Sequence, residues 1–206
     1  MYSTRVDFAL DQFIEENYFL PMHHQYHLKE EKDSGKSDLI LNVTNDNLCI
    51  YNFDDKRRCG FLRPEKKYGM QKSVDHVLLE KTADSWKLHL IEMKSGVGYK
   101  TWLKSIKPKV RTSYFNILAL AGFLGIRFCE VIVYTTYEKE RFLAEREVNP
   151  RMIMPQLGSE ARDPFRDEWE KDRVILNVGE ELVFSHKKVL MKKNALTGTL
   201  EGMLTI

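Results

Sequence analysis

The stretch SVDHVLLEKTADSWKLHLIEMKSGVG, residues 73–98, contains two apolar runs separated by a short polar segment. The runs, Val74 to Lys81 and Trp86 to Lys94, predict two strands, because the residues between them, Thr82 to Ser85, have the composition of a turn. A turn centred in this segment predicts an antiparallel hairpin with these opposite pairs: Lys81 and Trp86, Leu79 and Leu88, Val77 and Leu90, Asp75 and Glu92. Opposite side chains share a face of the hairpin, with Cβ atoms roughly 5 Å apart.

One face of this hairpin carries an apolar patch that ends in three charged residues, Asp75, Glu92 and Lys94. Two like charges that face each other beside a buried patch are destabilising unless a cation lies between them. Lys94 supplies one cation, and Mg²⁺ or Mn²⁺, which prefer hard oxygen ligands, would supply a better one. The prediction depends on the register, because a slip of one residue would send Asp75 to the opposite face from Glu92.

A metal of this kind normally keeps several waters, which suits hydrolysis of a phosphodiester. A water would attack the phosphorus, while Lys94 orients that water or stabilises the developing negative charge. The alternative is a buried ion-pair triad without chemistry. Two carboxylates and one lysine leave a negative excess in a partly buried place, and this excess is costly without a further cation.

The composition is that of an ordinary globular chain: 206 residues, 43% apolar and 30% charged, which suits one domain. The net charge of +2 is too small to argue for a nucleic-acid partner by itself. Cys49, Cys59 and Cys129 lack the spacing of a zinc or redox site and fit a reducing compartment. No leader and no apolar run of roughly 18 residues stands out, so we expect a cytoplasmic protein without a membrane span.

The N-terminal third predicts a helix followed by strands. Residues 4–20 have amphipathic helical spacing, and Glu15 or Glu16 lies either on the solvated face or within reach of the metal. His23 and His27 would share a helix face if the helix continued past Pro21, which is a second, zinc-based reading. Residues 30–37 read as a polar loop, and residues 38–53 as one long strand or two strands broken at 44–47.

Basic residues cluster on both sides of the hairpin. One cluster lies in the loop 54–72 and the other in 99–111, where Tyr99 and Trp102 are interleaved with positive charge. Such segments suit contact with phosphates and stacked bases, whereas the alternative is a solvated surface. The candidate nucleic-acid contacts are Arg57, Arg58, Lys66, Lys67, Lys100, Lys104, Lys107 and Arg111.

The rest of the chain predicts a crossover unit and a second hairpin. Residues 108–124 read as a helix, capped by Ser105 and buried over most of its circumference in its second half. Residues 128–135 read as an interior strand that completes a parallel βαβ unit with the preceding strand. Residues 137–146 read as a charged helix, and 173–178 with 181–190 as a hairpin. The tail, 197–206, suggests no chemistry.

The order helix, strand, strand, strand, helix, strand, with an Asp on the second strand and Glu-x-Lys on the third, resembles the PD-(D/E)XK phosphodiesterase superfamily. The resemblance implies an α/β (α+β) fold with a mixed central sheet, flanking helices and a restriction-endonuclease-like αβββαβ core. That core would span 1–136, and 137–206 would form a C-terminal extension packed on it, in one domain overall. This chain departs from the family pattern in two places. Val74 stands where many members have Pro, and the helix after Lys94 lacks the Gln-x-x-x-Tyr arrangement of the RecB-like branch and has Lys107, Arg111 and Tyr114 as its polar groups instead.

Carried over by position, the resemblance implies that Asp75 and Glu92 bind metal, that Lys94 is the catalytic lysine and that the Met93 carbonyl is a further ligand. An acid of the first helix serves some members, which again indicates Glu15 or Glu16. The implied activity is that of a Mg²⁺- or Mn²⁺-dependent nuclease, with DNA favoured over RNA and an endonuclease favoured. The alternative is an inactive nuclease-like module that binds nucleic acid or protein, and the extension is a candidate surface for a homodimer or a protein partner.

Overall fold

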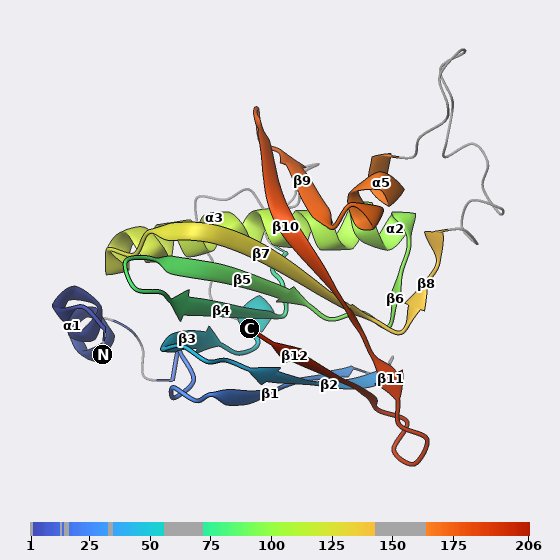
Figure 1. The fold of residues 1–206 in the computed structure, drawn as a ribbon, viewed down its shortest axis with the longest axis horizontal. Helices are drawn as coiled ribbons and strands as arrows, with labels where there is room; N and C mark the ends of the chain where they lie inside the picture. Colours follow the sequence, from blue (N-terminus) through green and yellow to red (C-terminus); the bar gives the residue numbers. More distant parts are fainter. Residues whose placement is uncertain (1, 13, 15–16, 33–34, 56–71, 143–163) are drawn as a thin grey trace.

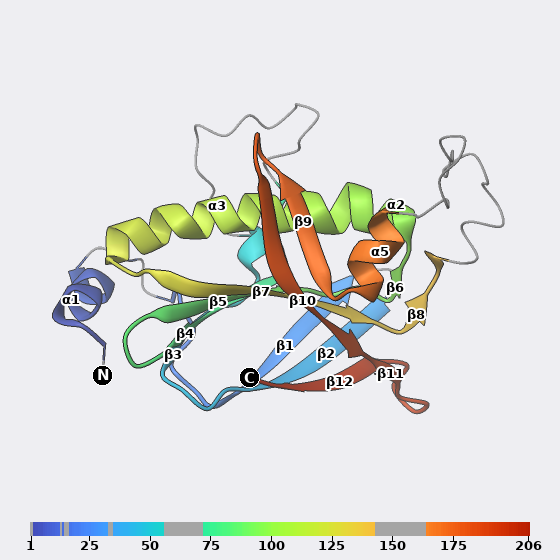
Figure 2. The ribbon, with the colours of Figure 1, turned by 45° about the horizontal axis from the view of Figure 1, so that its top comes forward.

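The computed structural model describes residues 2–12, 14, 17–32, 35–55, 72–142 and 164–206. Within them the chain is a mixed α+β structure with three layers, seen in Figures 1 and 2. A long helix covers one face of a six-stranded mixed sheet, and a four-stranded sheet covers the other face. In this part of the chain, no helix is long and apolar enough to cross a membrane.

The central sheet has the strand order β3-β4-β5-β7-β10-β9. Its strands are β3 (Asn47–Ile50), β4 (His76–Lys81), β5 (Trp86–Glu92), β7 (Phe128–Tyr137), β10 (Glu181–Leu190) and β9 (Arg173–Asn177). The first three form an antiparallel meander, and β7 runs parallel to β5 and to β10. The parallel βαβ unit predicted from the sequence is therefore confirmed.

The register of the β4–β5 hairpin is the predicted one. Lys81 lies opposite Trp86, Leu79 opposite Leu88 and Val77 opposite Leu90. The last ladder pair is His76 with Ile91, so Asp75 and Glu92 face each other directly beyond it. Turn composition and alternating apolar residues were sufficient for this prediction, because a one-residue slip would have placed the side chains of one strand on the wrong face relative to those of the other.

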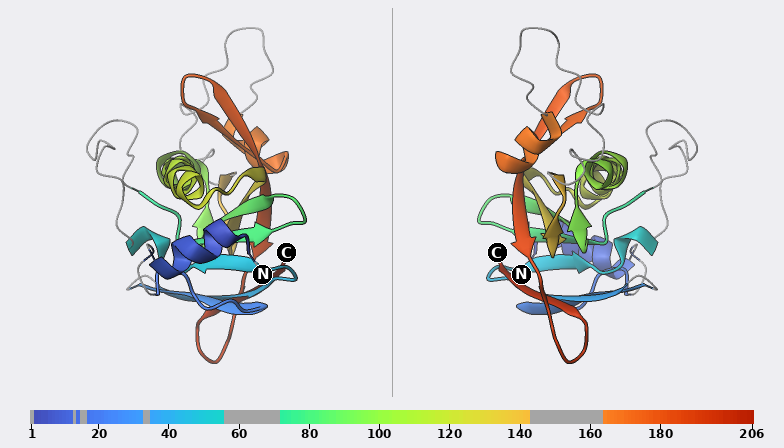
Figure 3. Two further views of the ribbon diagram at one scale, coloured as in Figure 1. Left: turned by 90° about the vertical axis from the view of Figure 1, so that its left-hand side faces the viewer. Right: turned by 90° about the vertical axis from the view of Figure 1, so that its right-hand side faces the viewer.

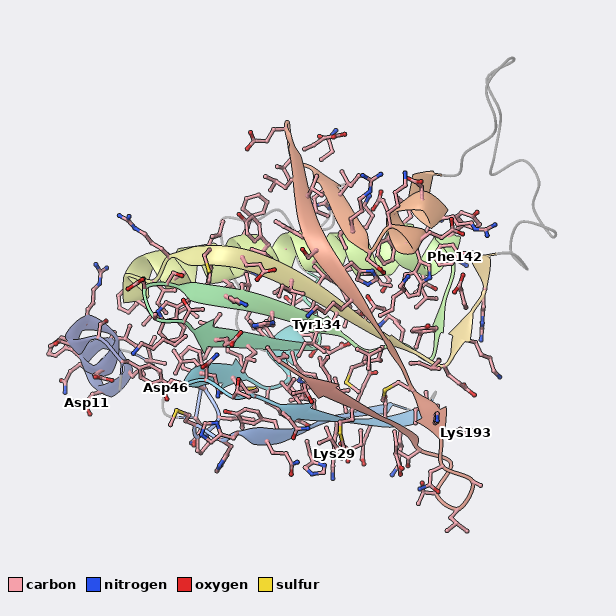
Figure 4. The ribbon with its side chains drawn as sticks, in the orientation of Figure 1. Asp11, Lys29, Asp46, Tyr134, Phe142 and Lys193 are labelled. Atoms are coloured by element: carbon pink, nitrogen blue, oxygen red, sulfur yellow. The ribbon has the colours of Figure 1, made fainter. Side chains whose placement is uncertain are left out.

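Both faces of this hairpin are buried, each in its own core. Val77, Leu79, Leu88 and Leu90 pack beneath the long helix, and Leu78 and Ile91 pack between the two sheets. The second core also contains a polar group: the His89 imidazole bonds the Glu80 carboxylate at 2.9 Å and the Tyr134 hydroxyl at 3.1 Å. Figure 4 labels Tyr134 on β7.

The four-stranded sheet corrects one sequence expectation, and its β2 strand decides between two others. Its order is β1 (Gln25–Lys32), β2 (Gly35–Asn42), β12 (Leu200–Thr205) and β11 (Lys192–Lys193). The predicted polar loop at 30–37 is wrong in its described part, because residues 30–32 and 35–37 form the ends of the antiparallel β1–β2 pair. Of the two alternatives for residues 38–53, the two-strand one is confirmed, because β2 ends at Asn42 and β3 begins at Asn47. The tail also belongs to this sheet, since β12 pairs in parallel with β2.

The first helix is shorter than predicted. Helix α1 covers Thr4–Gln12, and the Ile14 amide bonds the Ala9 carbonyl at 3.1 Å in a wide closing turn. Asn17 then adopts a left-handed conformation, with φ of 65°, and the Leu20 amide bonds the Cys49 carbonyl on β3 at 2.8 Å. The helix therefore stops because the chain is drawn onto the edge of the central sheet.

The histidine pair of the zinc reading does not share a helix. His27 lies on β1 and pairs with Asp38 on β2, with 3.2 Å between Nδ1 and Oδ2. Pro21 is followed by extended chain, which separates His23 from the face that His27 occupies. Among the described residues, no group of three or more His, Cys, Asp or Glu side chains is arranged to hold a metal ion. The zinc site suggested for His23 and His27 therefore lacks the shared helix face that it required.

The long helix begins nine residues earlier than predicted. It consists of α2 (Tyr99–Thr101), a π-helical turn η2 (Trp102–Ile106) and α3 (Lys107–Leu124), without a side-chain cap from Ser105. Pro108 has no amide proton to donate to this turn, and the Lys104 carbonyl accepts from Lys72 Nζ at 3.5 Å. The second half of α3 is less buried than expected: Ile117, Ala121 and Leu124 face the core, whereas Leu118 and Phe123 are exposed.

The C-terminal part extends the central sheet. The predicted β9–β10 hairpin is confirmed, with Glu181 opposite Asn177, and Figure 3 shows it rising past α3. The predicted helix 137–146 is wrong over residues 137–141. Strand β7 runs to Tyr137, and β8 (Lys139–Glu140) pairs in parallel with β6 (Gly96–Val97). Before β9 lies a short helix, α5 (Pro164–Glu170).

Candidate active site

Asp75 is held by backbone contacts on both sides. The preceding amide, that of Val74, donates to Ser113 Oγ on α3 at 2.9 Å, and the Asp75 carbonyl accepts from the Phe53 amide at 2.8 Å. Its carboxylate oxygen Oδ2 accepts from the Met93 amide at 2.7 Å, across the hairpin. The residue is 3% exposed, so the side chain is fixed in a buried position immediately before β4.

Glu92 and Lys94 lie at the end of β5. The Glu92 carboxylate is completely buried, and its Oε1 is in ion-pair contact with Lys94 Nζ. Lys94 Nζ also donates to the Met93 carbonyl at 3.0 Å, and the Lys94 amide donates to Thr136 Oγ1 at 3.1 Å. The structure therefore brings together Asp75, Glu92, Lys94 and the Met93 carbonyl, as the predicted hairpin face requires.

Lys109 on α3 is a fourth member of the site, and the sequence reasoning did not identify it. Its Nζ lies 3.1 Å from Asp75 Oδ1 and 2.8 Å from Glu92 Oε1. A signal was present, because residue 109 lies one helical turn from Ile106 and from Ser113, on the stripe that faces the sheet. A lysine on such a stripe needs a buried anion, and the two carboxylates of the hairpin supply it.

The electrostatics separate the two carboxylates. Burial, together with the neighbouring Asp75 charge, raises the pKa of Glu92 to about 7. Burial acts on Asp75 in the same direction, but Lys109, Lys94 and the Met93 amide outweigh it and lower the pKa of Asp75 below its usual value. Burial alone would lower the pKa of Lys109, whereas the two carboxylates raise it above its usual value. Asp75 and Lys109 are thus a firm ion pair, and Glu92 is the group nearest to taking up a proton.

The residues fit a divalent metal such as Mg²⁺ or Mn²⁺. Glu92 Oε2 is buried and accepts no hydrogen bond from the described residues. A buried oxygen without a donor is costly, and a bound cation would supply the partner that it lacks. The available ligands would be the Asp75 and Glu92 carboxylates and the Met93 carbonyl. All are hard oxygen donors, and Mg²⁺ in proteins is usually bound through one or two carboxylates.

Two cavities flank the site. A cavity of about 480 Å³ is lined by Asp75 with Asp54, and one of about 250 Å³ is lined by Lys94 with Met93. Glu30 of β1 lines both cavities. Figure 4 labels Lys29, which lines the larger cavity, and Lys193, which lines the smaller one. Both cavities therefore extend from the end of the hairpin to strand β1 of the four-stranded sheet.

The other candidate residues fall into three groups. Lys100 and Lys104 are exposed on the first turns of the long helix, where they can meet a polyanion. Lys107 points instead to Glu168 of α5, at 2.8 Å, and Arg111 is half-buried. The remaining candidates, Glu15, Glu16, Arg57, Arg58, Lys66 and Lys67, lie outside the described residues.

Comparisons with models of protein families, with curated proteins and with solved structures found no match for this chain.

Proposed function

We propose that this protein is a metal-dependent nuclease that hydrolyses phosphodiester bonds of nucleic acid, with a DNA endonuclease as the favoured form. The observation that carries the proposal is the convergence of Asp75, Glu92 and Lys94 at the end of the hairpin, with the buried Glu92 Oε2 left without a donor among the described residues. Phosphoryl transfer needs this combination of anionic metal ligands and a nearby cation.

The arrangement of elements supports the same proposal. Helix α1, the meander β3-β4-β5, the long helix and the parallel strand β7 follow one another in the αβββαβ order of the PD-(D/E)XK superfamily. In this chain the β1–β2 pair is inserted before the meander, and β10 and β9 continue the sheet beyond β7. The proposed restriction-endonuclease-like core thus corresponds to residues 1–136, with the extension completing its sheet.

Each residue of the site has a proposed role. Asp75, Glu92 and the Met93 carbonyl hold Mg²⁺ or Mn²⁺, which when bound supplies an acidified water and neutralises charge on the phosphate. Lys94 has a side chain that is 20% exposed, so it can reach substrate, whereas its ion-pair partner Glu92 is completely buried. Lys94 positions the attacking water or stabilises the developing charge. Lys100 and Lys104 contact the nucleic-acid backbone at the helix start.

A second candidate function is a nuclease-like module that binds nucleic acid or a protein without cleaving. One observation favours it: Lys109 already contacts both carboxylates, so the two acids and two lysines balance in charge without a metal. This candidate predicts binding that is indifferent to divalent metals. The nuclease proposal predicts cleavage that requires a divalent metal.

Cleavage assays separate the two. The purified chain is incubated with supercoiled plasmid, single-stranded DNA or RNA in Mg²⁺, Mn²⁺ or EDTA, beside Glu92→Gln and the matched surface variant Glu130→Gln. Glu130 is 41% exposed on β7 and pairs with Lys87. The nuclease proposal predicts cleavage that requires metal, is lost in Glu92→Gln and is kept in Glu130→Gln. Cleavage that survives in Glu92→Gln, or no cleavage of any substrate with either metal, contradicts it.

A further inference from the structure

Lys109 occupies the position between the two acids of the site. Its Nζ contacts Asp75 Oδ1 at 3.1 Å and Glu92 Oε1 at 2.8 Å, and its side chain is 14% exposed. Lys94 contacts only one of these carboxylates and is more exposed. The two lysines therefore differ in position: Lys109 bridges the acids from the helix side, and Lys94 approaches from the open side.

The bridge balances the charge of a buried cluster. Asp75 and Glu92 carry two negative charges when ionised, and Lys94 and Lys109 carry two positive ones. Separating a buried carboxylate from its partner is strongly destabilising, because the low-dielectric interior leaves the remaining charge uncompensated. Without a divalent cation, then, the two acids need both lysines.

With a divalent cation the same cluster would carry an excess of positive charge. Two carboxylates balance one Mg²⁺ or Mn²⁺, so each additional ammonium group in contact with them repels the ion. Lys109 contacts one oxygen of each acid, Asp75 Oδ1 and Glu92 Oε1, so its ammonium group lies against both carboxylates that would hold the ion. Its flexible four-carbon stem allows the ammonium group to withdraw while the helix backbone stays in place.

We propose that Lys109 is a resident counter-ion that competes with the divalent metal for Asp75 and Glu92, and that it leaves the two carboxylates when the metal binds. Lys109 is thus a positioning residue that lowers metal affinity and holds the two acids in place until the ion arrives. This inference rests on the proposed function. It goes beyond that function because it assigns to Lys109 of α3 the control of metal affinity.

The first test needs no variant. The lysines of the full-length chain are labelled with an amine-reactive reagent in EDTA and in Mn²⁺, and the labelling at each position is measured by mass spectrometry. Lys171, 52% exposed beyond α5, is the internal reference. Labelling of Lys109 is expected to rise several-fold in Mn²⁺ while labelling of Lys171 stays constant. Equal labelling of Lys109 in EDTA and Mn²⁺ overturns the proposal.

The second test measures affinity by calorimetric titration with Mn²⁺. Lys109→Met removes the competing charge and is expected to bind Mn²⁺ about tenfold tighter than the wild type, a change worth about 1.4 kcal/mol. Lys109→Arg keeps the charge, and Lys171→Met makes the same change of charge away from the site. Both are expected to bind as the wild type does. A merely structural role of Lys109 predicts equal or weaker binding in Lys109→Met, which overturns the proposal.

The outcomes separate this inference from the proposed function. If neither the wild type nor Lys109→Met binds Mn²⁺, both proposals fail. If the wild type binds Mn²⁺ and cleaves nucleic acid while Lys109→Met binds no tighter, only the role of Lys109 fails.

Discussion

Glu168→Ala should cost more stability than the removal of an exposed carboxylate in the C-terminal part, because Glu168 is buried. The Glu168 carboxylate is 6% exposed and accepts from Lys107 Nζ at 2.8 and 3.1 Å, from the Trp102 indole at 3.3 Å and from the Ile175 amide at 3.2 Å. These donors lie on α3, η2 and β9, so one side chain from α5 joins the extension to the long helix.

The magnitude follows from the burial of the partners. Breaking a buried ion pair by removing one member costs about 3 to 5 kcal/mol, because the other charge stays buried. The side chain of Lys107 is 16% exposed and gains some hydration, which reduces the cost, whereas the lost indole bond adds to it. We expect Glu168→Ala to lower the free energy of unfolding by about 3 to 4 kcal/mol.

The assay is equilibrium unfolding in urea, followed in parallel by tryptophan fluorescence and by far-ultraviolet circular dichroism. The matched control is Glu170→Ala on the same helix, where the carboxylate is 54% exposed and pairs with Arg166. This surface pair predicts a loss of at most about 1 kcal/mol. A loss below about 1 kcal/mol for Glu168→Ala as well would refute the reasoning, because the network would then not hold the extension to the helix.

Three further changes have expected outcomes. Burial lowers the pKa of His186 to about 3, below the roughly 6.5 of an unfolded chain, so only the unfolded state takes up this proton as the pH falls. Lowering the pH from 7.5 to 5.5 should therefore cost the wild type about 1.4 kcal/mol more than it costs His186→Gln in chemical unfolding, and an equal pH dependence of the two proteins would rule this out. Gly122→Ala should raise the free energy of unfolding by about 0.5 to 1 kcal/mol, because the added Cβ would meet no atom within 4 Å in the helix. Gly125→Ala should lower it by about 1 to 2 kcal/mol, because Gly125 has a left-handed φ of 71° that alanine adopts only with strain. A thermal melt in which both glycine variants shift in the same direction would contradict this. Lys94→Met should keep Mn²⁺ binding and lower the rate of cleavage by about 100-fold or more, and a rate within a few-fold of the wild type would exclude Lys94 from the reaction.

The hairpin of the site could be predicted from the sequence because its signals are local. A four-residue turn between two alternating apolar runs leaves one register that buries both faces, and this register places Asp75 beside Glu92. The crossover to β7 was predictable for the same reason, since a strand, a long helix and a β-branched strand in succession almost always form a parallel pair.

The missed features depend on contacts between distant parts of the chain. Strand β1 has only Tyr26 and Leu28 as buried apolar residues, and its polar outer face reads as a loop until the pairing with β2 is known. Strand β12 is held by a parallel partner more than 150 residues away in the sequence. Lys109 was overlooked because the long helix was expected to begin at Pro108, which places residue 109 in an exposed first turn rather than on the inner stripe.

The central claim is that Asp75 and Glu92 together hold one divalent metal ion. Free Mn²⁺ gives a strong electron paramagnetic resonance signal that is lost on binding, so a titration of the full-length chain counts the ions bound and their affinity. The account predicts a Mn²⁺ site in the wild type that is absent from Asp75→Asn and from Glu92→Gln and is kept in Glu130→Gln. A wild type that binds no Mn²⁺, or variants of the two acids that bind it as the wild type does, would contradict the account.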